Sequence, residues 1–235
     1  MAPKGTPQRS ICFEQPARRD SATVFRLAFR VTTRAQYFDP EELSKQVEPY
    51  DTLSEVYRKY TAQRPPHLVF SERIERKARE LAGGETDPVR IVSRIYDWID
   101  DIPWAGAIEY GVIPNIPEYV LDAGHGDCGQ VSLLLIAMLR SVGIPARWES
   151  GWMLHPGHVG LHDWGSVYYE GVGWVPLDIS FGKLAASADP AVRDFYKTGM
   201  DSYRLVVNSD YGYPFDPPKR HMRSEPVDFQ RGEAE

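Results

Sequence analysis

A cysteine, a histidine and an aspartate occur in this chain in an order that a cysteine nucleophile could use. Cys128 follows Gly126-Asp127 and precedes a strongly apolar stretch from Val131 to Val142. His162 lies in Leu161-His162-Asp163-Trp164, and Asp178 ends the run that begins at Gly173-Trp174. In such a site a thiolate attacks a carbonyl carbon, an imidazole carries the proton, and a carboxylate orients the imidazole. These residues therefore predict acyl-transfer chemistry on amides or esters.

The position of Cys128 favours its activation. A free thiol has a pKa near about 8.5, so a site that uses the thiolate must favour the anion. Cys128 opens a predicted helix, where the positive end of the backbone dipole favours an anion, and an imidazolium at His162 would favour it further. His162 and Asp178 lie on strands predicted to be antiparallel neighbours, joined by the turn at Gly171-Val172-Gly173. Their equal parity allows both side chains to share one face. The backbone N–H of Cys128 is a natural donor to the oxyanion.

Each of these residues alone also has an ordinary structural explanation. A cysteine that opens an apolar helix is usually a small buried hydrophobe, and a lone histidine or aspartate is usually a core, surface or turn residue. Only the ordered combination favours catalysis. A non-catalytic binding module on the same fold is one alternative. The second cysteine, Cys12, lies in a polar opening segment and is interpreted as a bystander, because a bridge to Cys128 would consume the nucleophile.

A metal site is the other alternative. His155, His158 and His162 follow one another closely, and His125 or Cys128 could complete a zinc set. Proline and glycines separate these histidines, which favours a loop over a helical zinc motif. We therefore expect no metal and no cofactor.

The elements that must position these residues run from helices to strands. The alternation of Phe25, Leu27, Phe29 and Val31 with basic residues predicts a strand. Short helices are predicted within 40–60, followed by a helix capped by Ser71 and ended by Gly83-Gly84 and a helix that begins at Asp87-Pro88. A loop over 103–125 leads to the central helix, which runs from Asp127-Cys128 to Gly143. Strands are predicted at 146–153, 162–169, 174–177 and 205–208, with a helix at 190–196 before the last of them.

This order predicts an α+β fold in which the nucleophile helix packs on an antiparallel sheet. The predicted domains are an N-terminal extension over 1–70, a catalytic core over 71–210 and a C-terminal tail over 211–235. The abrupt end at Glu235 suggests that the native chain continues.

Composition excludes several classes of function. The chain has 235 residues, 42% hydrophobic and 26% charged, with a formal net charge of −6. We therefore expect no nucleic-acid partner, and no apolar run approaches the roughly 20 residues of a membrane span. The N-terminus lacks the apolar segment of a signal peptide, so the sequence as written predicts a cytoplasmic protein. A secreted or periplasmic protein without its leader would look the same, and nothing in the sequence indicates an oligomeric state.

The segment from about Ile91 to Gly182 resembles the transglutaminase-like superfamily, a branch of the papain-like cysteine enzymes, and its bacterial members in particular. The family's nucleophile block, Gly-x-Cys, is here Gly126-Asp127-Cys128, and the family's helix ends in a run that is here Gly143 to Arg147. The histidine block, His-x-Trp, is here His162-Asp163-Trp164. The aspartate block, Gly-Trp-x-Pro-x-Asp, is here Gly173 to Asp178.

The resemblance implies a papain-like core in which Cys128 is the nucleophile, His162 the general base and acid, and Asp178 its orienter. Family members often place an aromatic donor before the nucleophile, which here suggests Trp104 for the oxyanion, although Trp104 equally suits core packing. Gln130 is a second candidate, and it equally suits a solvent-facing position at the helix start. One departure is that many members carry a carboxylate two residues after the tryptophan of the histidine block, where this chain has Ser166.

The implied reaction passes through a thioester at Cys128, with a peptide or other amide as substrate. Attack by water on that thioester gives hydrolysis, and attack by an amine gives transfer or cross-linking. We favour hydrolysis, as by an amidase or peptidase, because water is the default acceptor. Transglutaminase-type transfer to an amine stays open as the alternative.

Overall fold

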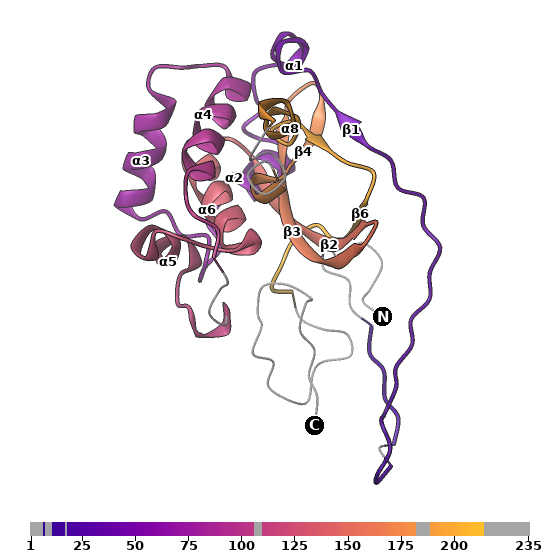
Figure 1. Ribbon diagram of the computed structural model, residues 1–235. Helices are drawn as coiled ribbons and strands as arrows, with labels where there is room; N and C mark the ends of the chain where they lie inside the picture. Colours follow the sequence, from indigo (N-terminus) through magenta and orange to yellow (C-terminus); the bar gives the residue numbers. More distant parts are fainter. Residues whose placement is uncertain (1–6, 8–10, 17, 106–109, 182–188, 214–235) are drawn as a thin grey trace.

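The computed structural model describes residues 7, 11–16, 18–105, 110–181 and 189–213. A group of helices lies against an antiparallel sheet, and an extended N-terminal arm runs along one side (Figure 1). The helices are α1 (Pro40–Gln46), α2 (Glu55–Thr61), α3 (Glu72–Ala82), α4 (Pro88–Asp100), the 3-10 helix η1 (Tyr110–Val112), α5 (Ile116–Ala123), α6 (Cys128–Ser141) and α8 (Pro190–Phe195). The strands are β1 (Gln36–Tyr37), β2 (Ala146–His155), β3 (His158–Tyr169), β4 (Gly173–Leu177), β5 (Gly199–Met200) and β6 (Arg204–Asn208). The α+β class predicted from the sequence is confirmed.

The main sheet brings residues from distant parts of the chain into register. Its strand order is β4-β3-β2-β6, and all of its pairs are antiparallel. β3 is central to the site, because it pairs with β4 on one side and with β2 on the other. β6, the last described strand, adds to the far edge of β2 with a register shift between Ser150 and Gly151. β1 and β5 form a separate small pair.

Helix α6 is the centre of the core. It contacts α3, α4 and α5 as well as strands β2 and β3. Its residues from Gly129 to Arg140 are all buried, and Trp148 on β2 is fully buried beside its first turn. A helix that is apolar all round is expected where helices cover one side and a sheet the other. The start of α6, which carries Cys128, is therefore held rigidly.

Local end signals placed several helices correctly. Ser71 caps α3 by accepting from the N–H of Ile74, and Gly83 ends that helix with a φ of 62°. Asp87 caps α4, which has proline in its first turn as predicted. The central helix, β4, α8 and β6 also lie where the sequence predicted them, within a few residues.

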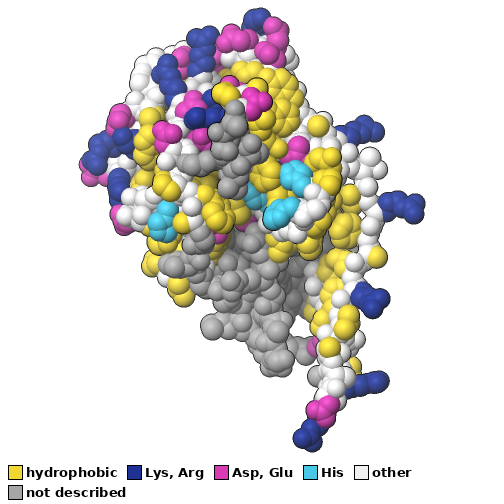
Figure 2. All heavy atoms as spheres, in the orientation of Figure 1, with side chains coloured by type: hydrophobic (Ala, Val, Ile, Leu, Met, Phe, Trp, Pro, Cys, Tyr) yellow, Lys and Arg dark blue, Asp and Glu magenta, His cyan; other side chains and the backbone are white. Residues whose placement is uncertain are grey.

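Three local predictions were wrong. Residues 25–31 form no strand. Among the described residues no strand pairs with them, and their apolar side chains stay exposed: Phe25, Leu27 and Phe29 are 51%, 56% and 54% exposed. Figure 2 shows basic side chains projecting along this arm. The predicted loop over 103–125 contains η1 and α5, the latter capped by Asn115. The β2–β3 hairpin is longer than predicted, since only Pro156 and Gly157 form its turn.

In the part of the chain that the structure describes, no helix is long and apolar enough to cross a membrane. Most of the predicted C-terminal tail, from residue 214 onward, lies outside the described residues.

We predict that Gly151→Ala destabilises the fold through the β2–β6 junction. A Cβ at Gly151 would overlap the carbonyl oxygen of Leu205 and lie 3.0 Å from the backbone nitrogen of Val207. Because backbone cannot move aside as a side chain can, we expect a loss of about 1–3 kcal/mol in the free energy of unfolding. Denaturant unfolding followed by fluorescence measures it.

Gly160→Ala on β3 is the matched control. A Cβ at Gly160 would approach only Met153 Cε, at 3.8 Å, which is ordinary contact. Its unfolding free energy should stay near that of the unmodified protein, and equal stability of the two variants would contradict the steric argument.

Candidate active site

The first turn of α6 fixes the position of Cys128. Asp127 is the N-cap, and its Oδ1 accepts the N–H of Gln130 at 3.0 Å. Gln130 Oε1 in turn accepts the N–H of Asp127 at 3.4 Å, which completes a capping box. The Tyr110 hydroxyl donates to Asp127 Oδ1. Cys128 is therefore the first residue of a doubly capped helix, with its side chain only partly buried.

His162 and Asp178 are in direct contact. His162 Nε2 lies 2.8 Å from Asp178 Oδ2, and both residues are buried, at 5% and 0% exposed. β3 carries His162, and Asp178 follows the last residue of β4, the strand paired with it. Because Nε2 is engaged by the carboxylate, Nδ1 is the ring nitrogen left for exchange of a proton with another group.

The Asp178 carboxylate is bonded to side chains and backbone groups from several elements. Its Oδ1 accepts the backbone N–H groups of Ser180 and Phe181 at 3.0 and 3.1 Å. Its Oδ2 also accepts from Arg204 Nη2 on β6 at 3.0 Å. Burial alone would raise the pKa of the Asp178 carboxyl, but the charges and hydrogen bonds of His162 and Arg204 hold that pKa below its usual value. Asp178 is therefore an ionised partner for the imidazole at neutral pH.

Cys128 and His162 line the same cleft. Its volume is about 390 Å³, and its other lining residues are Trp104, Met153, His158, Leu161 and Phe181. Phe181 packs edge-on against the His162 ring at a centroid distance of 5.2 Å. In the described part of the chain, no hydrogen bond joins the Cys128 sulfur to His162. The two side chains thus border one space that is open to a ligand.

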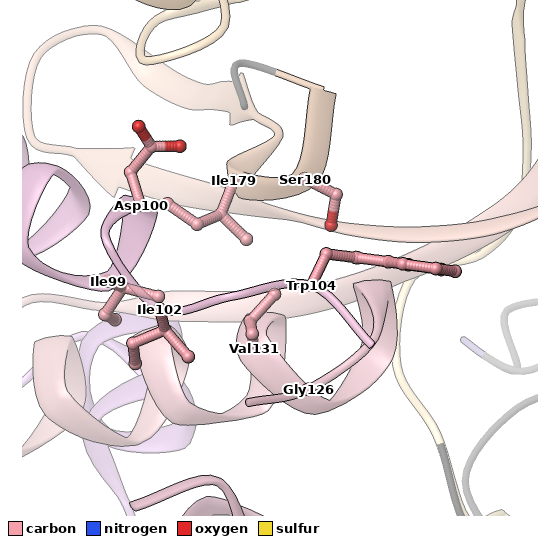
Figure 3. A pocket seen from close by; sticks show the side chains of 8 residues that line it. All are labelled: Ile99, Asp100, Ile102, Trp104, Gly126, Val131, Ile179 and Ser180. Atoms are coloured by element: carbon pink, nitrogen blue, oxygen red, sulfur yellow. The ribbon is translucent and has the colours of Figure 1, made fainter. Parts of the chain in front are cut away.

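Trp104 lies beside the nucleophile segment. The backbone of residues 103–105 pairs with Gly126: Gly126 N–H donates to Pro103 O at 3.2 Å, and Ala105 N–H donates to Gly126 O at 3.1 Å. Trp104 is 50% exposed, so it is not a core residue. Figure 3 shows Trp104 facing Ser180 at the end of a small crevice formed by Ile99, Ile102 and Val131. Trp104 is therefore available to a ligand in the cleft.

Gln130, the other candidate for the oxyanion, lies elsewhere. It is fully buried, so the alternative that it faces solvent is wrong. Its side chain belongs to the capping box and is absent from the cleft lining. Its position gives it a structural part in the helix start.

The Cys128 thiol donates to Asp163 Oδ2 at a sulfur–oxygen distance of 3.7 Å. Burial raises the pKa of the Cys128 thiol well above its ordinary value, and the carboxylates of Asp163 and Asp127 raise it further. The backbone N–H of Asp163 acts in the opposite direction. The activation expected from the helix dipole is thus outweighed in this resting arrangement.

The histidines of the proposed metal set are divided among other partners. His155 Nε2 lies 3.3 Å from Asp201 Oδ1, and His162 is bound to Asp178. His155 and His158 are cross-strand neighbours at the hairpin turn. Within the described residues, no group of three or more His, Cys, Asp or Glu side chains is arranged to hold a metal ion.

Sequence reasoning missed Arg204, Asp163, Tyr110 and Phe181. Arg204 and Phe181 reach the site only through the sheet order and the turn after β4, so no local pattern marks them. The sequence contained a signal for Asp163, which lies between His162 and Trp164 in the histidine block. The family pattern, however, treats that position as variable.

Comparisons with known proteins concern the family and the fold. Residues 75–179, which include Cys128, His162 and Asp178, match the model of the transglutaminase-like superfamily. A solved structure from Cytophaga hutchinsonii, described as a candidate cysteine protease, superposes with a TM-score of 0.52 at 19% identity, covering 62% of this chain and 49% of that chain. The periplasmic domain of TgpA from Pseudomonas aeruginosa gives a TM-score of 0.42 at 18% identity over 62% of this chain and 52% of that one.

A curated relative is the uncharacterized protein YebA of Bacillus subtilis (strain 168), 23% identical over 130 residues, which are 47% of this chain and 18% of YebA. This chain therefore spans only part of the length of the proteins it matches. Over residues 75–179 this chain matches the model of the transglutaminase-like superfamily, and over 62% of its length it shares the fold of the Cytophaga structure.

Proposed function

We propose that this protein is a cysteine-dependent acyl-transfer enzyme that acts on amide bonds through a thioester at Cys128, with water as the acceptor. The observation that carries the proposal is the shared cleft. Cys128 and the Asp178-bound His162 line one space of about 390 Å³. A thiol, a proton carrier and an orienting carboxylate within a ligand-sized cleft are what covalent catalysis of this kind requires.

The proposed reaction begins with transfer of the thiol proton to His162 Nδ1. The sulfur electron pair forms a bond to the amide carbonyl carbon, and the carbonyl oxygen becomes an oxyanion. The C–N bond then breaks, and the proton on Nδ1 passes to the leaving nitrogen, which departs as an amine. Water attacks the thioester with His162 as base, and the carboxylic acid and free thiol are released. Asp178 keeps Nε2–H bonded throughout, so Nδ1 stays directed to the reacting atoms.

Two donors suit the oxyanion. The backbone N–H of Cys128 belongs to the first turn of α6, where N–H groups have no partner within the helix. The indole N–H of Trp104 is a pure donor on a half-exposed side chain in the cleft wall. The cleft walls supplied by Trp104, Met153, Leu161 and Phe181 are apolar or aromatic, which supports an uncharged group next to the scissile carbonyl.

We predict that Cys128→Ala abolishes turnover and leaves the fold intact. The protein is incubated with a panel of amides, including glutamine side-chain amides and blocked peptides, and intact mass spectrometry is used to find an acyl adduct. Cys12→Ala is the matched control, since Cys12 is exposed and lies far along the chain from the cleft residues. Turnover by Cys128→Ala would refute covalent catalysis at this thiol, and adding a primary amine to the trapped adduct separates transfer from hydrolysis.

We predict unequal losses at the other two positions. His162→Ala should lower kcat/KM by about 10²–10⁴-fold, the usual contribution of a general acid–base group. Asp178→Asn should retain more activity but should also lower the melting temperature, because removing one partner of a buried ion pair costs about 3–5 kcal/mol.

Asp201→Asn is the control for Asp178→Asn. It removes the other carboxylate paired with Arg204, at 3.3 Å, without touching His162. Its turnover should match that of the unmodified protein. A near-normal rate in folded Asp178→Asn would remove Asp178 from the mechanism.

Trp104→Phe tests the indole N–H. If that N–H binds the oxyanion, kcat should fall by about 10²–10³-fold with little change in KM, since the contact strengthens only in the transition state. Steady-state kinetics on the best amide of the panel measure both constants. A rise in KM at constant kcat would instead assign Trp104 to substrate packing alone.

A further inference from the structure

Asp163 is a buried carboxylate that contacts the proposed nucleophile. It is 0% exposed and is the next residue after His162 on β3. Its Oδ2 accepts the S–H of Cys128 at 3.7 Å, so the thiol proton already has an acceptor that is not the imidazole. In the proposed reaction His162 accepts the thiol proton, and no role is assigned to Asp163.

The packing around Gly129 holds the Asp163 carboxylate in place. A Cβ at Gly129 would lie 2.9 Å from Asp163 Oδ2 and 2.8 Å from Trp148 Cη2, and it would overlap the Tyr110 hydroxyl. The first turn of α6 therefore approaches β3 so closely that only glycine fits. The Asp163 carboxylate is therefore packed directly against this turn.

We propose that Asp163 is a positioning residue that holds resting Cys128 as a neutral thiol, with its S–H directed to Asp163 Oδ2 and away from His162. The effect of Asp163 on turnover rests on the proposed function. The protonation state of the resting Cys128 thiol does not depend on that function. For turnover, a change in the Cys128 side-chain rotamer would take the sulfur from Asp163 toward His162 Nδ1. The S–H bond then breaks, the N–H bond forms, and the sulfur pair is free to attack.

The charges facing the thiol support this assignment. Negative groups outnumber positive ones, and the cation of Arg204 is already paired with Asp178 and Asp201. Burial and the Asp163 carboxylate both raise the pKa of the thiol. The titratable and charged groups around it are Asp127 at the start of α6, Tyr110 on η1, His158, His162 and Asp163 on β3, Asp178 after β4, and Arg204 on β6.

The test measures the rate of alkylation of Cys128 by iodoacetamide as a function of pH. The full-length protein carries Cys12→Ser, so that alkylation occurs only at Cys128. In this background the thiol should titrate well above the free value of about 8.5. Titration at or below that value would overturn the proposal without any change at Asp163.

Asp163→Asn keeps the size of the side chain and the backbone N–H but removes the charge. We expect the alkylation profile to shift to lower pH and the rate at neutral pH to rise about tenfold or more, since each pKa unit is tenfold in thiolate while the thiol is mostly protonated. An unchanged or slower rate in the folded variant would overturn the proposal. Asp163→Ser serves the same purpose if the asparagine variant does not fold.

Asp100→Asn is the matched control. Asp100 is also a buried carboxylate, but it is the last residue of α4 and is paired with Arg193 at 3.0 Å. Its alkylation profile should not move, and a shift equal to that of Asp163→Asn would assign the effect to net charge and overturn a specific role for Asp163. No substrate is needed for these measurements, so their failure is distinct from a failure to trap an acyl adduct on Cys128.

Discussion

The site depends on one buried anion, the Asp178 carboxylate. Placing a carboxylate in the interior costs several kcal/mol unless charges and hydrogen bonds compensate. Here His162, Arg204 and two backbone N–H groups after β4 supply them. These donors come from β3, β6 and the turn that follows β4, so the electrostatic requirement of one side chain ties three parts of the sheet together. The same requirement fixes the imidazole ring with Nδ1 free, and the orientation of the proposed base is thus a consequence of burying its partner.

A second constraint acts at the start of α6. The helix dipole there favours the Cys128 thiolate, whereas burial and nearby carboxylates disfavour it. A helix terminus typically contributes about 0.3–1 kcal/mol to a nearby anion, which is less than one pKa unit at 1.36 kcal/mol per unit. Burial and two carboxylates oppose it, and the pKa of the Cys128 thiol lies well above its ordinary value. A helix dipole alone is therefore too weak to define an activated cysteine. Whether a thiol at a helix start is activated depends on the groups that the rest of the fold packs against it.

The features that the sequence could predict depend on interactions between residues close together in the chain, and those that it could not predict depend on contacts between distant segments. Ser71, Asp87 and Asp127 cap their helices through bonds to residues two or three positions away, so local patterns located these helix starts. The arm at 25–31 has the alternation of a strand, but a strand also needs a partner, and alternation does not supply one. Arg204 and Asp163 were missed for the same reason. Arg204 meets Asp178 only because β6 joins the sheet beyond β2, and Asp163 meets Cys128 only because Gly129 lets α6 approach β3.

The missing carboxylate after the histidine block illustrates how a sheet can relocate a group. Position 166 is serine, but Glu149 on β2 lies directly across from Trp164, and its Oε2 accepts the indole N–H at 2.9 Å. Arg147 binds the other oxygen of the same carboxylate at 2.7 Å. Directly opposite cross-strand residues have Cβ atoms about 4.5–5.5 Å apart, closer than residues two apart along one strand. A carboxylate from a neighbouring strand can therefore lie beside the same tryptophan. A carboxylate that a family motif places at one position can therefore be supplied by a residue on a neighbouring strand. A departure from the family pattern has to be judged together with the register of the strands around it.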